Sequence, residues 1–439
     1  MTNSSFSNPV TIFNTVQPGL GISTSNGTVS IGTNGISNAL FRQSAASSLV
    51  GNSAGTTGNV ADITLGTGLT FTGTTLAIGT SGVTAGTYGD VLSSSQITVD
   101  ALGRISVGTT NALVQDGAGF VNKFRNPGMT IAQRGTSGNT TNSVNTYTLD
   151  GWMLLTVGAN CAWGQVSDFT YAPTSGKALY WLGNTGNVNS TVIQRIEGSL
   201  CNSLAGQQVT VQAVISHNAG SAVVPRLVVN RANALDNWSS STAEVSYVAF
   251  QSCPSGASTR VAYTFACSSS ARNGLEVQFE MNGNPLTGTS YCAIGDVDIR
   301  ATPGVSTGVN NSPPAIEQRS IQTELAICRR YLPAFSGNGS NTTIASGMCY
   351  STTASRICVP FNVPARIAPT GISAQAASNY VVYNSAAANV TATSIGFVNA
   401  STTACNIDIG VASGLVAGDA TLAITNGTSN NILFTGAEL

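Results

Sequence analysis

The chain has 439 residues, a formal net charge of −1 and only 8% charged side chains, whereas 42% of its residues are hydrophobic. Disorder is excluded, because it combines low hydrophobicity with high net charge. With only two lysines, the sequence has no basic stripe for a nucleic acid or an anionic membrane surface. No apolar run approaches the roughly 18 residues of a membrane span. We therefore expect neither a nucleic-acid partner nor membrane insertion.

The N-terminal quarter is almost free of charge. Residues 1–115 hold no Lys or Glu, and a soluble domain that folds alone usually carries more solvated charge. Two segments repeat, GLGISTSNGTVSIGTNGI at 19–36 and GLTFTGTTLAIGTSGV at 68–83. Each predicts two short strands joined by a tight turn, at Asn26-Gly27 in the first. One apolar face is too little for a core, so we expect three chains to share these faces. A flexible linker is the alternative, but it has no use for recurring Leu, Val and Ile.

Two segments of this N-terminal region resemble segments of a known protein family. Residues 41–51 (FRQSAASSLVG) and 82–110 (GVTAGTYGDV to GRISVGTT) resemble segments that recur in tail-fibre and head-fibre proteins of tailed bacteriophages. The resemblance implies a virion anchor at 1–40, which binds other tail or baseplate proteins, followed by a trimeric β shaft at 41–119. It also implies a homotrimer on the virion, assembled in the host cytoplasm. The N-terminus lacks the pattern of a secretory signal, which agrees with that location.

The next block, residues 120–302, alternates like antiparallel strands. Apolar and polar residues alternate in the segment 275–280, so that Leu275, Val277 and Phe279 face one side and Glu276 and Glu280 the other. Residues 209–215 alternate in the same way. Strands so spaced predict a two-sheet jelly roll. The segments NPGM (126–129), QRIE (194–197) and IGDVDI (294–299) resemble the jelly-roll module of phage tail fibres and of carbohydrate-binding modules. That resemblance implies a host surface polysaccharide as partner.

Sugar binding requires exposed aromatic faces beside amides and carboxylates. The candidates in this block are Tyr180 and Trp181, next to a polar stretch, and Trp238 in a loop-like segment. Packing or an interchain contact is the alternative for each. Trp152, flanked by Met-Leu-Leu, is expected in the core. Related modules hold a structural calcium, and Asp296 matches one ligand, but Thr130 replaces the expected Glu. Asp296 is therefore only a weak metal candidate, and we expect no cofactor.

Residues 303–335 predict a linker and one α-helix. Ser320 is the expected N-cap, Pro333 ends the helix, and its apolar stripe is Ile321, Leu325, Cys328 and Leu332. EQRSIQTELAICRRYL (317–332) resembles the junction that follows the jelly roll in many phage fibres. We expect this helix to pack either around a trimer axis or onto its own head.

Residues 336–439 repeat the β pattern and predict a small C-terminal β domain, which the family places at the tip. Its candidate glycan contacts are Tyr350, Tyr380 and Tyr383. The nine cysteines are odd in number and lack CxxC spacing, so reduced, buried thiols are expected. Cys349 and Cys358 are the first pair to test for a disulfide.

Together these features predict an all-β protein with a shaft, a jelly-roll head, a linking helix and a terminal β domain. The expected function is that of a bacteriophage tail fibre, a receptor-binding protein for a host-cell surface glycan. A head fibre or other virion decoration is the first alternative, and a polysaccharide depolymerase is the second. We expect no enzyme and no catalytic residues, because most acids stand alone in the sequence. The single histidine, His217, has no GxSxG partner.

Overall fold

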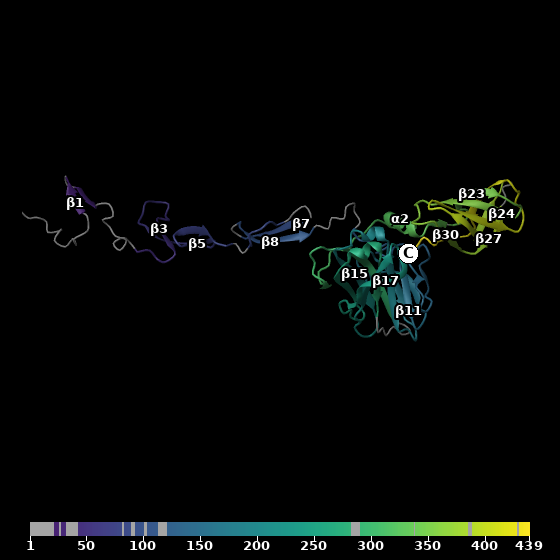
Figure 1. Ribbon diagram of the computed structural model, residues 1–439, viewed down its shortest axis with the longest axis horizontal. Coiled ribbons are helices and arrows are strands. Elements are labelled where there is room, and N and C mark those ends of the chain that lie inside the picture. Colours follow the sequence, from purple (N-terminus) through teal and green to yellow (C-terminus); the bar gives the residue numbers. More distant parts are fainter. Residues whose placement is uncertain are drawn as a thin grey trace, which may run out of the picture. The chain divides into compact units, whose positions relative to one another are not determined.

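The computed structural model describes residues 22–25, 28–31, 43–80, 83–88, 93–100, 103–112, 121–281, 290–337, 339–384, 389–427 and 430–439 (Figure 1). The chain divides into two compact units, Met1–Asn111 and Ala112–Leu439. Nearly all of its regular structure is β, which confirms the predicted fold class. The predicted anchor at 1–40 lies outside the described residues, apart from two short strands. No described helix is both long and apolar enough to cross a membrane.

The described part of the first unit forms four two-stranded hairpins. They are β1–β2 (Ile22–Ser25, Thr28–Ile31), β3–β4 (Ser48–Gly51, Ala61–Thr64), β5–β6 (Leu69–Thr72, Thr75–Ile78) and β7–β8 (Ser93–Val99, Ile105–Ala112). The predicted strand pair in each repeat is confirmed. In strand register, Ile22 pairs with Ile31 as Leu69 pairs with Ile78, and the predicted match of Leu20 to Leu69 lies outside the described residues. The predicted turn residues 26–27 lie outside the described part of the chain.

The hairpin of the second repeat, β5–β6, has one apolar face. In β5–β6, Leu69 lies opposite Ile78 and Phe71 opposite Leu76, so all four side chains share one face. The exposed fraction is 47% for Leu69, 42% for Leu76 and 80% for Ile78. A two-stranded hairpin has no second layer to cover such a face, so these side chains remain in water in a single chain.

The second unit begins with a β-sandwich, whose strands β11, β15 and β17 are labelled in Figure 1. One sheet has the order β10 (Thr146–Tyr147), β11 (Met153–Val157), β14 (Asn189–Ile196), β19 (Leu275–Glu280), β16 (Arg226–Ala234) and β17 (Asn237–Ala249). The other has the order β21 (Gly308–Val309), β18 (Ser258–Ala266), β15 (Gln208–His217), β20 (Tyr291–Ala301), β13 (Lys177–Leu182), β12 (Ala162–Ser167) and β9 (Ser137–Asn139). A helical turn, α1 (Gly198–Cys201), and a 3₁₀ turn, η2 (Ser269–Asn273), complete the sandwich.

The sandwich core follows the predicted alternation. Leu275, Val277 and Phe279 are fully buried between the sheets, while Glu276 and Glu280 point to the outer face and pair with arginines. Trp152 is buried, as predicted, and its Nε1 donates a hydrogen bond to the Asn126 carbonyl at 2.9 Å. The buried indole is thereby both packed and hydrogen-bonded.

Helix α2 (Ile321–Tyr331) begins at Ser320, whose side chain accepts a hydrogen bond from the Thr323 N–H, as predicted for an N-cap. Cys328 and Leu332 are buried, in agreement with the predicted stripe. Ile321 does not belong to the buried face, because it is 60% exposed. The buried face of the helix includes Glu324 and Tyr331 instead, because both make polar contacts with buried partners. Glu324 pairs with Arg319, and the Tyr331 hydroxyl donates to Glu197.

The helix packs onto its own sandwich, which is one of the two predicted placements. The Arg319 Nε lies 2.7 Å from Glu324 Oε2, and the Arg319 guanidinium also donates to the Asn122 and Phe124 carbonyls. Glu324 Oε1 accepts the Asn126 N–H at 2.6 Å. The EQR and NPGM motifs, almost 200 residues apart, therefore form one buried polar joint.

The C-terminal part is a closed barrel with a small sheet beside it. The barrel has the order β23 (Thr343–Cys349), β24 (Ala354–Pro360), β28 (Ala404–Val411), β27 (Asn389–Ala400), β26 (Tyr380–Tyr383) and β29 (Ala420–Thr425). The small sheet has the order β22 (Ala334–Gly337), β30 (Asn430–Thr435) and β25 (Gly371–Ala374), with a 3₁₀ turn, η3, at Ala377–Asn379. All nine cysteines are free thiols. The suggested Cys349–Cys358 disulfide is wrong, because Ser355, and not Cys358, lies opposite Cys349.

Candidate glycan-binding surfaces

Two of the predicted aromatic contacts lie in hydrophobic cores. Trp181 is 1% exposed inside the sandwich, where its Nε1 donates to Ser190 Oγ at 3.0 Å. Tyr380 is fully buried in the barrel, and its hydroxyl donates to the Asn431 carbonyl at 2.8 Å. Neither ring offers a face to a ligand, so the prediction that these two residues contact a glycan is corrected.

Tyr180 lies on the outer face of the seven-stranded sheet, in a cluster of three tyrosines. Its ring stacks on Tyr291 with centroids 5.2 Å apart, and Tyr171 lies 6.2 Å from Tyr180 and 5.5 Å from Tyr291. A hydrogen bond with Tyr291, followed by burial, raises the pKa of Tyr171 to about 12. All three rings are half-buried against one another. The sequence indicated Tyr180 but missed its partners, which reach it from a loop and a different strand.

Two segments of the chain already cross this outer face. The loop 168–176 is held by Asp296, whose carboxylate accepts the Thr174 and Ser175 N–H groups at 2.7 and 2.8 Å. The linker is held at Pro314, whose carbonyl accepts hydrogen bonds from Gln212 and Arg260. Asp296 thus fixes a loop in this structure, and the described residues contain no cluster of three or more groups that could hold a metal ion.

Trp238 lies on the outer face of the six-stranded sheet. The Arg195 guanidinium is 5.1 Å from the centre of its half-buried ring, and Arg195 pairs with Glu276 at 2.7 Å. A similar arrangement surrounds Tyr247, which is 57% exposed, with Arg226 4.7 Å from its ring. One face of the Trp238 ring is therefore occupied by a cation–π contact within the chain.

Tyr350 is the predicted contact that has both an exposed ring and an ion pair beside it. It is 48% exposed after β23, and its hydroxyl donates to Asp408 Oδ2 at 3.0 Å. Arg356 holds the same carboxylate in a two-pronged contact of 2.8 and 3.0 Å, and its guanidinium lies 5.2 Å from the Tyr350 ring centre. Hydrogen bonds from Arg356 keep the pKa of Asp408 below its usual value. The ring and the ion pair thus hold one another in place.

Met348 extends this arrangement across the barrel surface. It is 52% exposed, and Met348, Arg356 and Asp408 are neighbours in register on β23, β24 and β28. We call Met348, Tyr350, Arg356 and Asp408 the barrel platform. It combines apolar surface with a donor and an acceptor, which is what the two sides of a pyranose ring require. Tyr383, 39% exposed, lies on β26 opposite Leu422 and does not join it.

The sequence held a signal for the missing platform residues. Arg356 and Asp408 each lie on a strand between two inward-facing residues, so the alternation directs both outward. Their proximity depends on strand pairing across about 50 residues, which no local pattern reports.

His217 does not provide a catalytic base. It is fully buried, its Nδ1 accepts the Ala219 N–H, and its Nε2 lies 2.9 Å from the Cys253 carbonyl. Both ring nitrogens are therefore occupied by the backbone.

No family model matches the sequence, and no curated protein matches it. Several solved structures share a likeness of fold. The enzymatically active domain of tailspike protein 4 from Bacteriophage CBA120 has a TM-score of 0.28 and 14% identity, over 41% of this chain and 21% of that one. The CBM22-1 xylan-binding domain of Paenibacillus barcinonensis Xyn10C has a TM-score of 0.25 and 11% identity, over 38% of this chain and 94% of that one. The C-terminal family 22 carbohydrate-binding module of Clostridium thermocellum Xyn10B has a TM-score of 0.26 and 10% identity, over 38% of this chain and 100% of that one. The chain thus spans about a fifth of the tailspike domain and nearly all of the two modules.

Proposed function

We propose that the protein is a trimeric attachment fibre of a tailed bacteriophage, a tail fibre that binds a host-cell surface polysaccharide. One observation carries the proposal. The hairpin β5–β6 of the first unit gathers large apolar side chains on one face and leaves them exposed, with Ile78 at 80%. Copies of the chain that share these faces bury them, as fibre shafts do. In this proposal residues 1–40 join the fibre to other tail or baseplate proteins, after assembly in the host cytoplasm.

The barrel platform supports the glycan part of the proposal. Tyr350 offers a rigid aromatic face at low entropic cost, and Arg356 keeps an exposed guanidinium edge beside it. Single aromatic sugar sites bind weakly. Three copies on one fibre convert weak sites into useful avidity where the receptor geometry lets several engage together.

Competition for adsorption tests the proposal. Purified protein, added to host cells before the phage, is expected to reduce adsorption, and Tyr350→Ala and Arg356→Ala are expected to weaken that competition about tenfold or more. Ile367→Ala, which removes another exposed apolar side chain from the same domain, serves as the control and is expected to compete normally. If the wild-type protein does not compete, the tail-fibre proposal fails and a head fibre or other virion decoration replaces it. New reducing ends in host polysaccharide incubated with the protein would instead indicate a depolymerase.

A further inference from the structure

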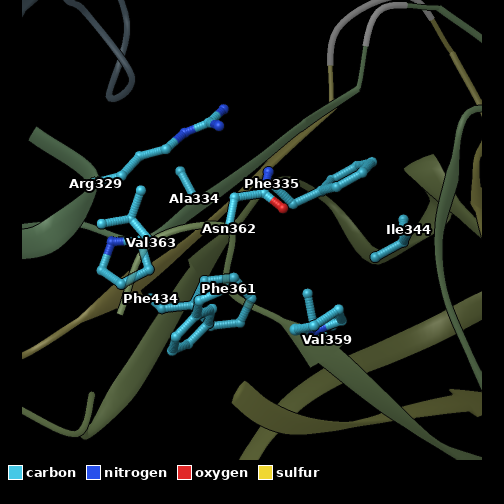
Figure 2. Close-up of a pocket in the computed structure, with 11 residues that line it drawn as sticks. Arg329, Ala334, Phe335, Ile344, Val359, Phe361, Asn362, Val363 and Phe434 are labelled. Atoms are coloured by element: carbon cyan, nitrogen blue, oxygen red, sulfur yellow. The ribbon is translucent and has the colours of Figure 1, made fainter. Parts of the chain in front are cut away.

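A pocket of about 230 Å³ lies where helix α2 leads into the C-terminal domain (Figure 2). Its floor is apolar. The rings of Phe361 and Phe434 lie 5.0 Å apart at 57° to one another, Ile344 and Val359 come from the barrel strands, and Phe335 forms one wall. These side chains come from four separate stretches of the chain. The pocket therefore exists only in the folded domain, and no sequence motif marks it.

Two polar side chains stand at the rim of this apolar pocket, Arg329 from α2 and Asn362 from the loop after β24. Within the described residues, the Arg329 side chain makes a single hydrogen bond, from Nε to Gln133 Oε1 at 3.4 Å. Among the described residues its two terminal nitrogens have no hydrogen-bond partner, and no carboxylate lies within ion-pair distance. The Asn362 side chain is exposed, and it too makes no hydrogen bond to the described part of the chain.

The other arginines of this segment are different. Arg319 pairs with Glu324 at 2.7 Å, and Arg330 holds Glu197 with contacts of 2.8 and 2.9 Å. The segment thus neutralises two of its guanidinium groups with internal carboxylates and leaves the third, Arg329, at the mouth of a pocket lined by phenyl rings. A half-buried cation without an internal anion is a ready partner for an external one.

We propose that this pocket binds a sugar unit that carries a carboxylate, such as a uronic acid of an acidic polysaccharide. The apolar face of the sugar ring lies on the half-buried rings of Phe335 and Phe361, the carboxylate meets the terminal nitrogens of Arg329, and the Asn362 amide bonds a ring hydroxyl. The volume is below the roughly 300 Å³ at which pockets for drug-sized ligands begin, so one sugar unit is the matching size. This inference rests on the proposed function and adds a receptor class to it.

Two glycosides that differ only at C6 test the inference. Binding of methyl glucuronide and methyl glucoside to the full-length protein is measured by saturation-transfer NMR titration. The glucuronide is expected to bind at least ~10-fold more tightly, because it alone offers the carboxylate for a charge-assisted, two-pronged contact. Arg329→Gln is expected to reduce its affinity to that of the glucoside, while Arg272→Gln, an exposed arginine of the sandwich, leaves both affinities unchanged.

A second variant keeps the test independent of Arg329. Val363→Phe places a ring in the pocket from its rim and is expected to abolish binding of both glycosides while the melting temperature is retained. Equal affinities for the two glycosides, an Arg329→Gln variant that binds like the wild type, or glucuronide binding that survives Val363→Phe would each overturn the inference. Competition for adsorption without glucuronide binding would refute this pocket alone. Glucuronide binding without competition for phage adsorption would support the pocket as a binding site and would refute the tail-fibre proposal.

Discussion

Replacing Arg319 by methionine should detach helix α2 from the β-sandwich and destabilise the protein strongly. Arg319 and Glu324 are each only 4% exposed at their side chains, and Arg319 also binds the Asn122 and Phe124 carbonyls. The substitution leaves the Glu324 carboxylate buried without its cation. Breaking a buried pair in this way lowers the free energy of unfolding by about 3–5 kcal/mol.

Denaturation of the full-length protein measures this effect. All four tryptophans lie in the sandwich, at 152, 163, 181 and 238, so their fluorescence reports the domain to which the helix is docked. At about 2–4 °C per kcal/mol for a domain of this size, the melting temperature should fall by roughly 6–20 °C. The double variant Arg319→Met/Glu324→Leu should be more stable than Arg319→Met alone, because it removes both charges.

An exposed arginine supplies the control for this prediction. Arg272→Met removes a guanidinium from the sandwich surface and should change the free energy of unfolding by no more than ~0.5 kcal/mol. If Arg319→Met costs less than about 1 kcal/mol, the pair does not hold the helix to the sandwich, and the idea that the two motifs form one joint is refuted.

Three further outcomes are expected. Burial raises the pKa of Glu438 to about 7 despite its contact with Arg134, so the folded state holds a proton that the unfolded state loses above pH 4.5. This contribution, roughly 3 kcal/mol, is complete below pH 4.5 and is lost as the pH rises through about 7; Glu438→Gln should remove that part of the pH dependence of the melting temperature. Ile78→Thr should weaken the proposed trimer in sedimentation analysis, whereas Thr70→Ser, on the opposite hairpin face, should not; an equally stable oligomer in both would contradict a shared apolar face. Trp181→Ala should lower the free energy of unfolding by about 3–5 kcal/mol because it empties a core position, and a stability close to that of the wild type would contradict its burial.

The elements with a strong local period were predictable from the sequence. The alternation of residues 275–280 specified both the strand and its inward face, and Ser320 with Pro333 bounded the helix. Tyr180 and Trp181 show where such reasoning ends. Neighbours on a strand must point to opposite faces, but the sequence does not say which of two aromatic residues lies inside. Packing decides this, and it placed the larger ring in the core.

The candidate sites were harder to predict, for a related reason. Tyr350 stood out as an aromatic residue among polar neighbours, but its value as a platform depends on Arg356 and Asp408, which the barrel register brings to it. The pocket beside Arg329 depends on phenylalanines at positions 335, 361 and 434, spread over 100 residues. Contacts of such long range are properties of the fold and leave no periodic signal in the chain.

The joint between sandwich and C-terminal domain gives these sites a common physical basis. Gln133 donates to the Leu332 carbonyl, the Tyr147 hydroxyl donates to the Leu439 carbonyl at 2.8 Å, and Arg330 holds Glu197. These contacts tie the sandwich to both ends of the C-terminal domain. A binding surface carried on a free hinge loses affinity to the ordering of that hinge, and this loss recurs at each copy of the site. A domain held in a fixed position avoids this loss of affinity. An attachment protein that relies on several weak sites therefore gains most from rigid contacts between its domains.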